Sequence, residues 1–69
     1  MEGDDPTGRP GRVTAHIGPG ELGEVVIGFG SRTDTYVAAG ARGESFDVGE
    51  TVVVVTVTAG KHVLVSAFS

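Results

Sequence analysis

The stretch from Gly18 to Gly23 reads Gly-Pro-Gly-Glu-Leu-Gly and matches the G-x-G-x-x-G fingerprint of dinucleotide-binding sites. In such sites the glycines let the backbone approach the pyrophosphate, and a helix that begins there directs its N-terminus at the phosphates. Here the chain continues into Glu24 to Phe29, where apolar residues recur at every second position, as they do in a strand. We therefore interpret the stretch as a turn, and we predict no bound cofactor.

The two histidines, His16 and His62, are the residues from which a metal site would have to start. A zinc site needs several ligands close together, but the chain has no cysteine and the spacing assigns no further ligand to either histidine. His16 occupies a polar position in an alternating segment, and His62 follows a predicted hairpin. We expect both side chains at the surface and no bound metal.

The hydroxyl and carboxylate side chains form no catalytic pattern. The pairs Asp47 with Glu50 and Asp34 with Glu44 flank predicted strands, where acidic residues commonly serve in turns. We therefore predict no catalytic residue, and we expect a protein that is not an enzyme. The serines lie outside any G-x-S-x-G elbow and have no His and Asp partners at an informative position: Ser31, Ser45, Ser66 and Ser69.

The length of 69 residues and the formal net charge of −4 limit both the fold and the partners. A chain this short forms one domain, and its 12 glycines and 3 prolines favour tight turns between short strands. The negative charge argues against nucleic acid as a partner, because such binding draws on clustered Lys and Arg. The basic residues stand singly in the sequence and form no stripe, although the fold could bring some of them together: Arg9, Arg12, Arg32, Arg42 and Lys61.

The run from Thr51 to Thr58 is the strongest structural signal, because every residue in it is a β-branched Thr or Val. Such side chains favour an extended backbone. Alternation places Val53, Val55 and Val57 on one face, and the other face also begins with valine. Since both faces start apolar, we predict a strand enclosed by its neighbours in a small, closed or nearly closed sheet.

Further segments show the alternation of half-buried strands. Gly28 and Gly30 are expected to mark a bulge or a sharp coil. Phe46 and Val48, which precede the valine run, are expected to cover the core together. The expected inward positions are Val13, Ala15 and Ile17 in residues 11–17, Val25, Ile27 and Phe29 after Leu22, Tyr36 and Ala38 in residues 33–39, and Val63, Val65 and Ala67 in residues 62–68.

Together these segments predict an all-β domain of about five short antiparallel strands with no substantial helix. Residues 11–69 are expected to form the domain, and residues 1–10, which are polar and contain Pro and Gly, a flexible linker or lead. An SH3-like barrel and a lipoyl-type sandwich use similar elements. The lipoyl sandwich carries a modified lysine, whereas Lys61 follows Gly60 and has no methionine beside it.

Glycines, turns and alternating apolar residues follow one another in a definite order: Gly8 and Gly11, Pro19 and Gly20, Gly23-Glu24-Val25, Tyr36-Val37-Ala38, Gly49, Thr51 to Val55, and Val63-Leu64-Val65. This order, from Gly8 to Phe68, resembles the C-terminal soluble domain of NfeD-like proteins. The shared features specify a scaffold rather than an activity. The chain departs from the family pattern at Phe46, where a β-branched residue is usual, and at Ala67, where a proline is usual.

The resemblance implies a five-stranded OB-fold barrel that follows a membrane-anchoring segment, which would lie before Met1. It also implies that the full-length bacterial proteins work with stomatin- or flotillin-like (SPFH) membrane proteins. By this analogy the domain is a non-catalytic interaction or assembly module, held at the plasma membrane by a segment outside this chain.

Two binding functions are compatible with an OB-fold barrel. The first is protein interaction through a strand edge or the barrel surface. The alternative is binding of single-stranded nucleic acid or an oligosaccharide, a common use of this fold. The negative charge and the small number of aromatic residues, one Tyr and three Phe, disfavour the alternative. We therefore predict a protein partner and no nucleic acid.

Overall fold

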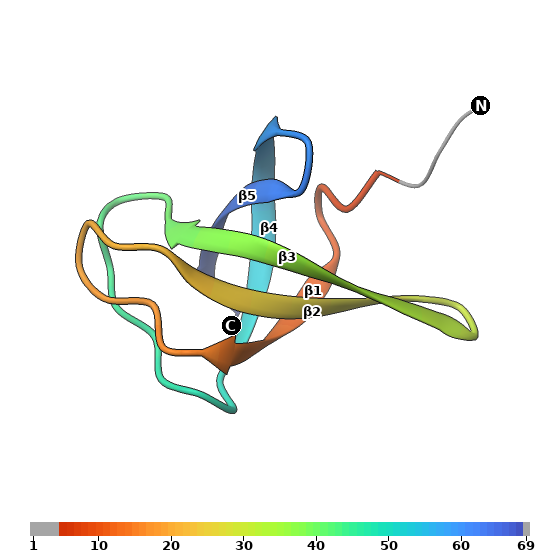
Figure 1. Cartoon of the computed structure of the whole chain (residues 1–69), viewed down its shortest axis with the longest axis horizontal. Helices are drawn as coiled ribbons and strands as arrows, with labels where there is room; N and C mark the ends of the chain where they lie inside the picture. Colours follow the sequence, from red (N-terminus) through yellow and green to blue (C-terminus); the bar gives the residue numbers. More distant parts are fainter. Residues whose placement is uncertain (1–4, 69) are drawn as a thin grey trace.

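A computed structural model describes residues 5–68, which form a closed five-stranded barrel with no helix (Figure 1). The predicted all-β fold class is confirmed. The strands lie side by side in the order β1-β2-β3-β5-β4, and β4 returns to β1. Their bounds are β1 Pro10–Ala15, β2 Gly23–Phe29, β3 Arg32–Gly40, β4 Thr51–Ala59 and β5 His62–Ala67.

One pairing differs from the expected antiparallel pattern. β3 and β5 run parallel, with Val37 beside His62 and Gly40 beside Val65, whereas the other pairings are antiparallel. The reason is the loop of residues 41–50, which carries the chain across one end of the barrel to β4. The β4–β5 hairpin then returns the chain beside β3 in the direction in which β3 runs.

A bulge in the valine strand changes which side chains reach the core. Val52 and Val54 are buried, as alternation requires, but the register with β5 shifts between Val54 and Thr56, so that Val55 is an extra residue and is exposed. Beyond the bulge Val57 packs against the core. The prediction that Val57 shares a face with Val53 and Val55 is therefore wrong, because one inserted residue inverts the alternation.

A second bulge has the same effect in β1. The register with β2 shifts between Val13 and Ala15, and Ala15 is exposed although it was expected inside. Ile17 still reaches the core, because its backbone forms a two-way bridge with Phe46 at N···O distances of 3.0 and 2.8 Å. Of the bulge or sharp coil expected at Gly28 and Gly30, the bulge is not formed. The β2–β3 register is unbroken, and Gly30 instead supplies the positive φ of 68° for the two-residue hairpin turn.

The remaining inward predictions hold except at two positions. Val48 is exposed, because it lies in the turn that follows Phe46, so that Phe46 covers the core alone. Ala67 is exposed at the end of β5, beyond the last core residue of that strand. The core is otherwise aliphatic and aromatic, and no polar or charged side chain of residues 5–68 is buried: Val13, Ile17, Val25, Ile27, Phe29, Tyr36, Ala38, Phe46, Val52, Val54, Val63 and Val65 make up the core.

Contacts with β4 extend to residues before Gly11, where the sequence places the domain boundary. Gly8 donates its backbone N–H to the carbonyl of Val54 at 2.8 Å, and the Val54 N–H donates to the carbonyl of Arg9 at 3.0 Å. Pro6 is buried. Residues 1–4 of the expected lead lie outside the described residues. Residues 5–68 contain no helix that is long enough and apolar enough to span a membrane.

Substitution of two glycines of β2 tests how closely the end of this strand packs against the segment that follows β1. A Cβ at Gly23 would lie 2.5 Å from the His16 carbonyl oxygen and 2.6 Å from that of Ala15, whereas a Cβ at Gly28 would meet nothing within 4 Å. We expect Gly23→Ala to lower the free energy of unfolding by about 1–3 kcal/mol, because backbone atoms would have to move. Gly28→Ala in the same strand is the control. It is expected either to raise the free energy of unfolding or to leave it unchanged. Urea unfolding measures both, and equal stability of the two variants would contradict the close approach at Gly23.

Candidate functional site

The described residues offer no enclosed site. Residues 5–68 contain no pocket and no group of three or more His, Asp or Glu side chains arranged to hold a metal ion. The stretch from Gly18 to Gly23 forms a loop, closed by a hydrogen bond from the Glu21 N–H to the Gly18 carbonyl at 3.0 Å, and leads directly into β2. It lacks the helix that a dinucleotide site requires.

The other candidates of the sequence are held in turns. His16 Nδ1 lies 3.3 Å from Asp47 Oδ1 at the surface, and His62 is exposed at the start of β5. The Asp47 N–H donates to Glu50 Oε2 at 2.8 Å, so this pair of acids shapes a turn. Asp34 lies near the start of β3, whereas Glu44 lies beyond its end, so that the structure does not bring these two carboxylates together.

Two carboxylates have perturbed titration for the same local reason. The Glu44 carboxylate accepts a hydrogen bond from the Arg42 N–H at 2.8 Å, which lowers the Glu44 pKa, with a further backbone hydrogen bond from Glu44 itself. The Thr7 N–H donates to Asp5 Oδ1 at 3.0 Å and lowers the Asp5 pKa. Hydrogen bonds to the ionised form favour it. These acids stabilise loops and are not arranged for proton transfer.

A charged cluster occupies the end of the barrel where the β2–β3 hairpin projects (Figure 1). Arg32, Asp34, Tyr36 and Ala38 alternate on the inner face of β3. Ala38 and Tyr36 are buried, while the side chains of Asp34 and Arg32 are 30% and 52% exposed. The face becomes charged where β3 extends past the β5 pairing, which begins at Val37. An inner face outside the closed part of the barrel can therefore hold ionised groups.

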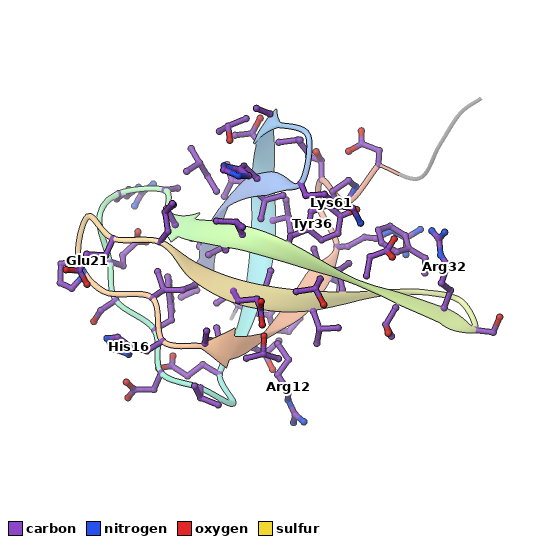
Figure 2. All side chains as sticks on the ribbon, in the orientation of Figure 1. Arg12, His16, Glu21, Arg32, Tyr36 and Lys61 are labelled. Atoms are coloured by element: carbon purple, nitrogen blue, oxygen red, sulfur yellow. The ribbon has the colours of Figure 1, made fainter. Side chains whose placement is uncertain are left out.

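Three basic side chains gather over the two rings that close this end. The Arg9 and Arg32 guanidinium carbons lie 4.9 and 5.1 Å from the centroid of the Phe29 ring. Lys61 Nζ lies 4.8 Å from the centroid of the Tyr36 ring, and the two rings are 6.5 Å apart. Figure 2 shows Arg32, Tyr36 and Lys61 at the same end of the molecule. We call Arg9, Arg32 and Lys61 the cationic end.

Asp34 links two residues of the cationic end, Arg32 and Lys61. Its Oδ2 lies 3.6 Å from Arg32 Nη2, and its Oδ1 lies 3.7 Å from Lys61 Nζ. The cationic end thus contains three of the five basic residues of a chain whose formal net charge is −4. Figure 2 shows Glu21 and His16 at the opposite end of the molecule. Basic residues that stand singly in the sequence are therefore brought together at one end of the fold.

Comparison with known proteins decides the family. The family model of the NfeD C-terminal domain matches residues 10–66. The chain belongs to the NfeD C-terminal domain family. It is also similar to the solution structure of the soluble domain of the NfeD protein YuaF from Bacillus subtilis, with a TM-score of 0.76 and 28% identity over 87% of this chain and 70% of that one. No curated protein matched. The resemblance proposed from the sequence is confirmed.

Sequence analysis missed the cationic end of this NfeD domain. Arg9, Arg32 and Lys61 are separated by more than twenty residues each and carry no shared motif. A signal was present in the alternation of β3, where Arg32 and Asp34 continue the inner face of Tyr36 and Ala38 with charge. Arg32 lies opposite Phe29 and Asp34 lies opposite Ile27 across the β2–β3 hairpin. An alignment of the two strands in the sequence would therefore have predicted charged side chains beside apolar ones.

Replacing the lysine of the cationic end tests whether these contacts also stabilise the NfeD domain. Lys61→Gln removes the cation over Tyr36 and the ion pair with Asp34, and we expect the free energy of unfolding to fall by about 0.5–1 kcal/mol. Arg12→Gln, at an exposed position on β1, is the control and is expected to change it by less than about 0.5 kcal/mol. Thermal and urea unfolding measure both. A Lys61→Gln domain as stable as the control would show that the contact contributes nothing to folding.

Proposed function

We propose that this NfeD domain is a non-catalytic interaction and assembly module of a membrane-anchored bacterial protein that works with SPFH membrane proteins. The observation that carries the proposal is a barrel interior filled entirely by apolar side chains within the described residues. A filled interior leaves no space for a substrate, so function depends on the outer surface. Membership of the NfeD family supplies the partner class.

Attachment to the plasma membrane, through a segment outside this chain, is part of the proposal. The solved relative is likewise the soluble domain of an NfeD protein. In such an arrangement the domain is held close to other membrane proteins, and tethering raises the effective concentration of weak surface contacts. A small barrel with a charged end can then act without high intrinsic affinity.

Binding of single-stranded nucleic acid or an oligosaccharide, the alternative raised by the fold, is less well supported by the surface. Nucleic-acid barrels stack bases on open aromatic rings. Phe29 and Tyr36 are only 9% and 6% exposed, and basic side chains lie over both rings. The cationic end therefore has no accessible ring on which a base could stack, although Phe68 is exposed elsewhere. The remainder of the chain is negatively charged.

Affinity purification of the full-length protein from cross-linked membranes tests the proposal. We expect an SPFH protein to be recovered, because the domain contributes contacts to that assembly. The control is the same membrane anchor from which residues 5–68 have been removed, which is expected to lose the SPFH protein. Recovery of the SPFH protein by the anchor alone, or its absence from both samples, would contradict the proposed role of the domain.

A further inference from the structure

Half of β3 has an unpaired edge. β2 pairs with β3 from Arg32 to Ala38, whereas β5 pairs with it only from Val37 to Gly40. The Val37 N–H donates to the Lys61 carbonyl at 2.8 Å, which fixes Val37 as a residue whose backbone groups face the β5 side. Because this direction alternates along a strand, Thr35 and Thr33 face the same side. No strand of the described residues lies there.

The free edge is bordered by the cationic end. Arg32 precedes Thr33 in the strand, and Lys61 begins the part of the chain that pairs with Val37. The side chains of Arg32 and Lys61 are 52% and 60% exposed, and both reach toward Asp34, which lies between them. Backbone donors and acceptors therefore lie next to positive charge on one short segment of the surface.

We propose that the first half of β3 is the docking site for an extended, carboxylate-rich segment of a protein partner. The segment adds as a strand beside Thr33 and Thr35 and places carboxylates against Arg32 and Lys61. Backbone hydrogen bonds supply affinity in such strand addition, and side chains supply specificity. The inference rests on the proposed function, because it names the chemistry of the partner that the NfeD domain binds.

Strand geometry specifies the spacing of the acids in the partner. Side chains that point to the same face of an extended peptide lie about 7 Å apart, at every second residue. Only these side chains can meet the inner face of β3, where the basic groups lie. The docking segment therefore carries Asp or Glu on this face opposite Arg32 and Lys61, with a serine or threonine between them opposite Asp34. Its other positions face the solvent with the threonines of β3.

Asp34 distinguishes a peptide from a continuous anionic surface. A membrane of anionic lipids or a nucleic acid backbone would bring phosphates against the Asp34 carboxylate as well as against the cations. An extended peptide can instead present a hydroxyl or an N–H to Asp34 and carboxylates to Arg32 and Lys61. The covered rings of Phe29 and Tyr36 also leave nucleic acid bases without a stacking surface beside these cations.

Titration of the ¹⁵N-labelled NfeD domain with a ten-residue peptide of repeating Glu-Thr-Ser-Thr sequence, whose inward face alternates Glu and Ser, tests the inference by NMR. We expect saturable shifts of the Thr33, Thr35 and Lys61 amides, weakened by added salt. The double variant Arg32→Gln/Lys61→Gln should bind roughly 2- to 30-fold more weakly. The control pair Arg12→Gln/Arg42→Gln removes the same charge away from the edge and should bind as the parent does, and the spectra report whether each variant is folded.

A second probe separates the edge from the charge and leaves the protein unchanged. The same peptide with methylated backbone nitrogens at alternate residues keeps its carboxylates but cannot pair with Thr33 and Thr35, and we expect it not to bind. Equal binding of the methylated peptide would overturn strand addition. Tighter binding of phosphatidylglycerol vesicles or oligothymidylate than of the acidic peptide would overturn the choice of partner.

The membrane purification separates this inference from the function on which it rests. Recovery of the SPFH protein by the parent and its loss from Arg32→Gln/Lys61→Gln would support both. Equal recovery by the two would overturn the docking site and leave the proposed function intact. If the parent recovers no SPFH protein, the proposed function fails, and the peptide titration still decides whether the edge of β3 binds acidic strands.

Discussion

The NfeD barrel depends on the pairing of β4 along both of its edges. β5 covers one edge over the length of β4, and β1 with the residues before it covers the other from Thr51 to Val54. The chain has no cysteine, so this closure and the apolar side chains inside it must stabilise a domain of only 69 residues. The bulge at Val55 contributes to this core, because it returns the Val57 side chain to the interior beyond the point where β4 separates from β1.

Closure also determines where function can lie. The interior is filled by apolar side chains, and most strand edges in the described part of the chain are paired. The first half of β3 is an exception, because the β2–β3 hairpin extends past the start of β5. The second half of β4 is another, because its pairing on the β1 side ends at Val54. Three basic side chains lie at the end of the barrel that carries the first half of β3, over Phe29 and Tyr36. The cations cover the rings that end the core and also place charge beside an open edge, so stability and recognition share one set of residues.

Much of the fold followed from the alternation of apolar residues. β2, β3 and β5 placed Val25, Tyr36 and Val63 inside as predicted, because no bulge interrupts their alternation before these residues. Ala15 and Val57 were misplaced, since the bulges in β1 and β4 involve ordinary Thr and Val residues rather than glycine. The cationic end could not be predicted, because its residues come from three distant segments that meet only once β3 and β5 are paired in parallel.

Amide hydrogen exchange measures most directly whether the first half of β3 is an open edge of the barrel. The amides of Thr33 and Thr35 are predicted to exchange at close to unprotected rates. The amides of Asp34 and Tyr36, which alternation directs toward β2, are predicted to exchange more slowly by about two orders of magnitude or more. This alternation within one strand excludes simple fraying of the hairpin, which would expose Asp34 as well. Protection of Thr33 and Thr35 equal to that of Asp34 and Tyr36 would show that the edge is covered, and would contradict the account.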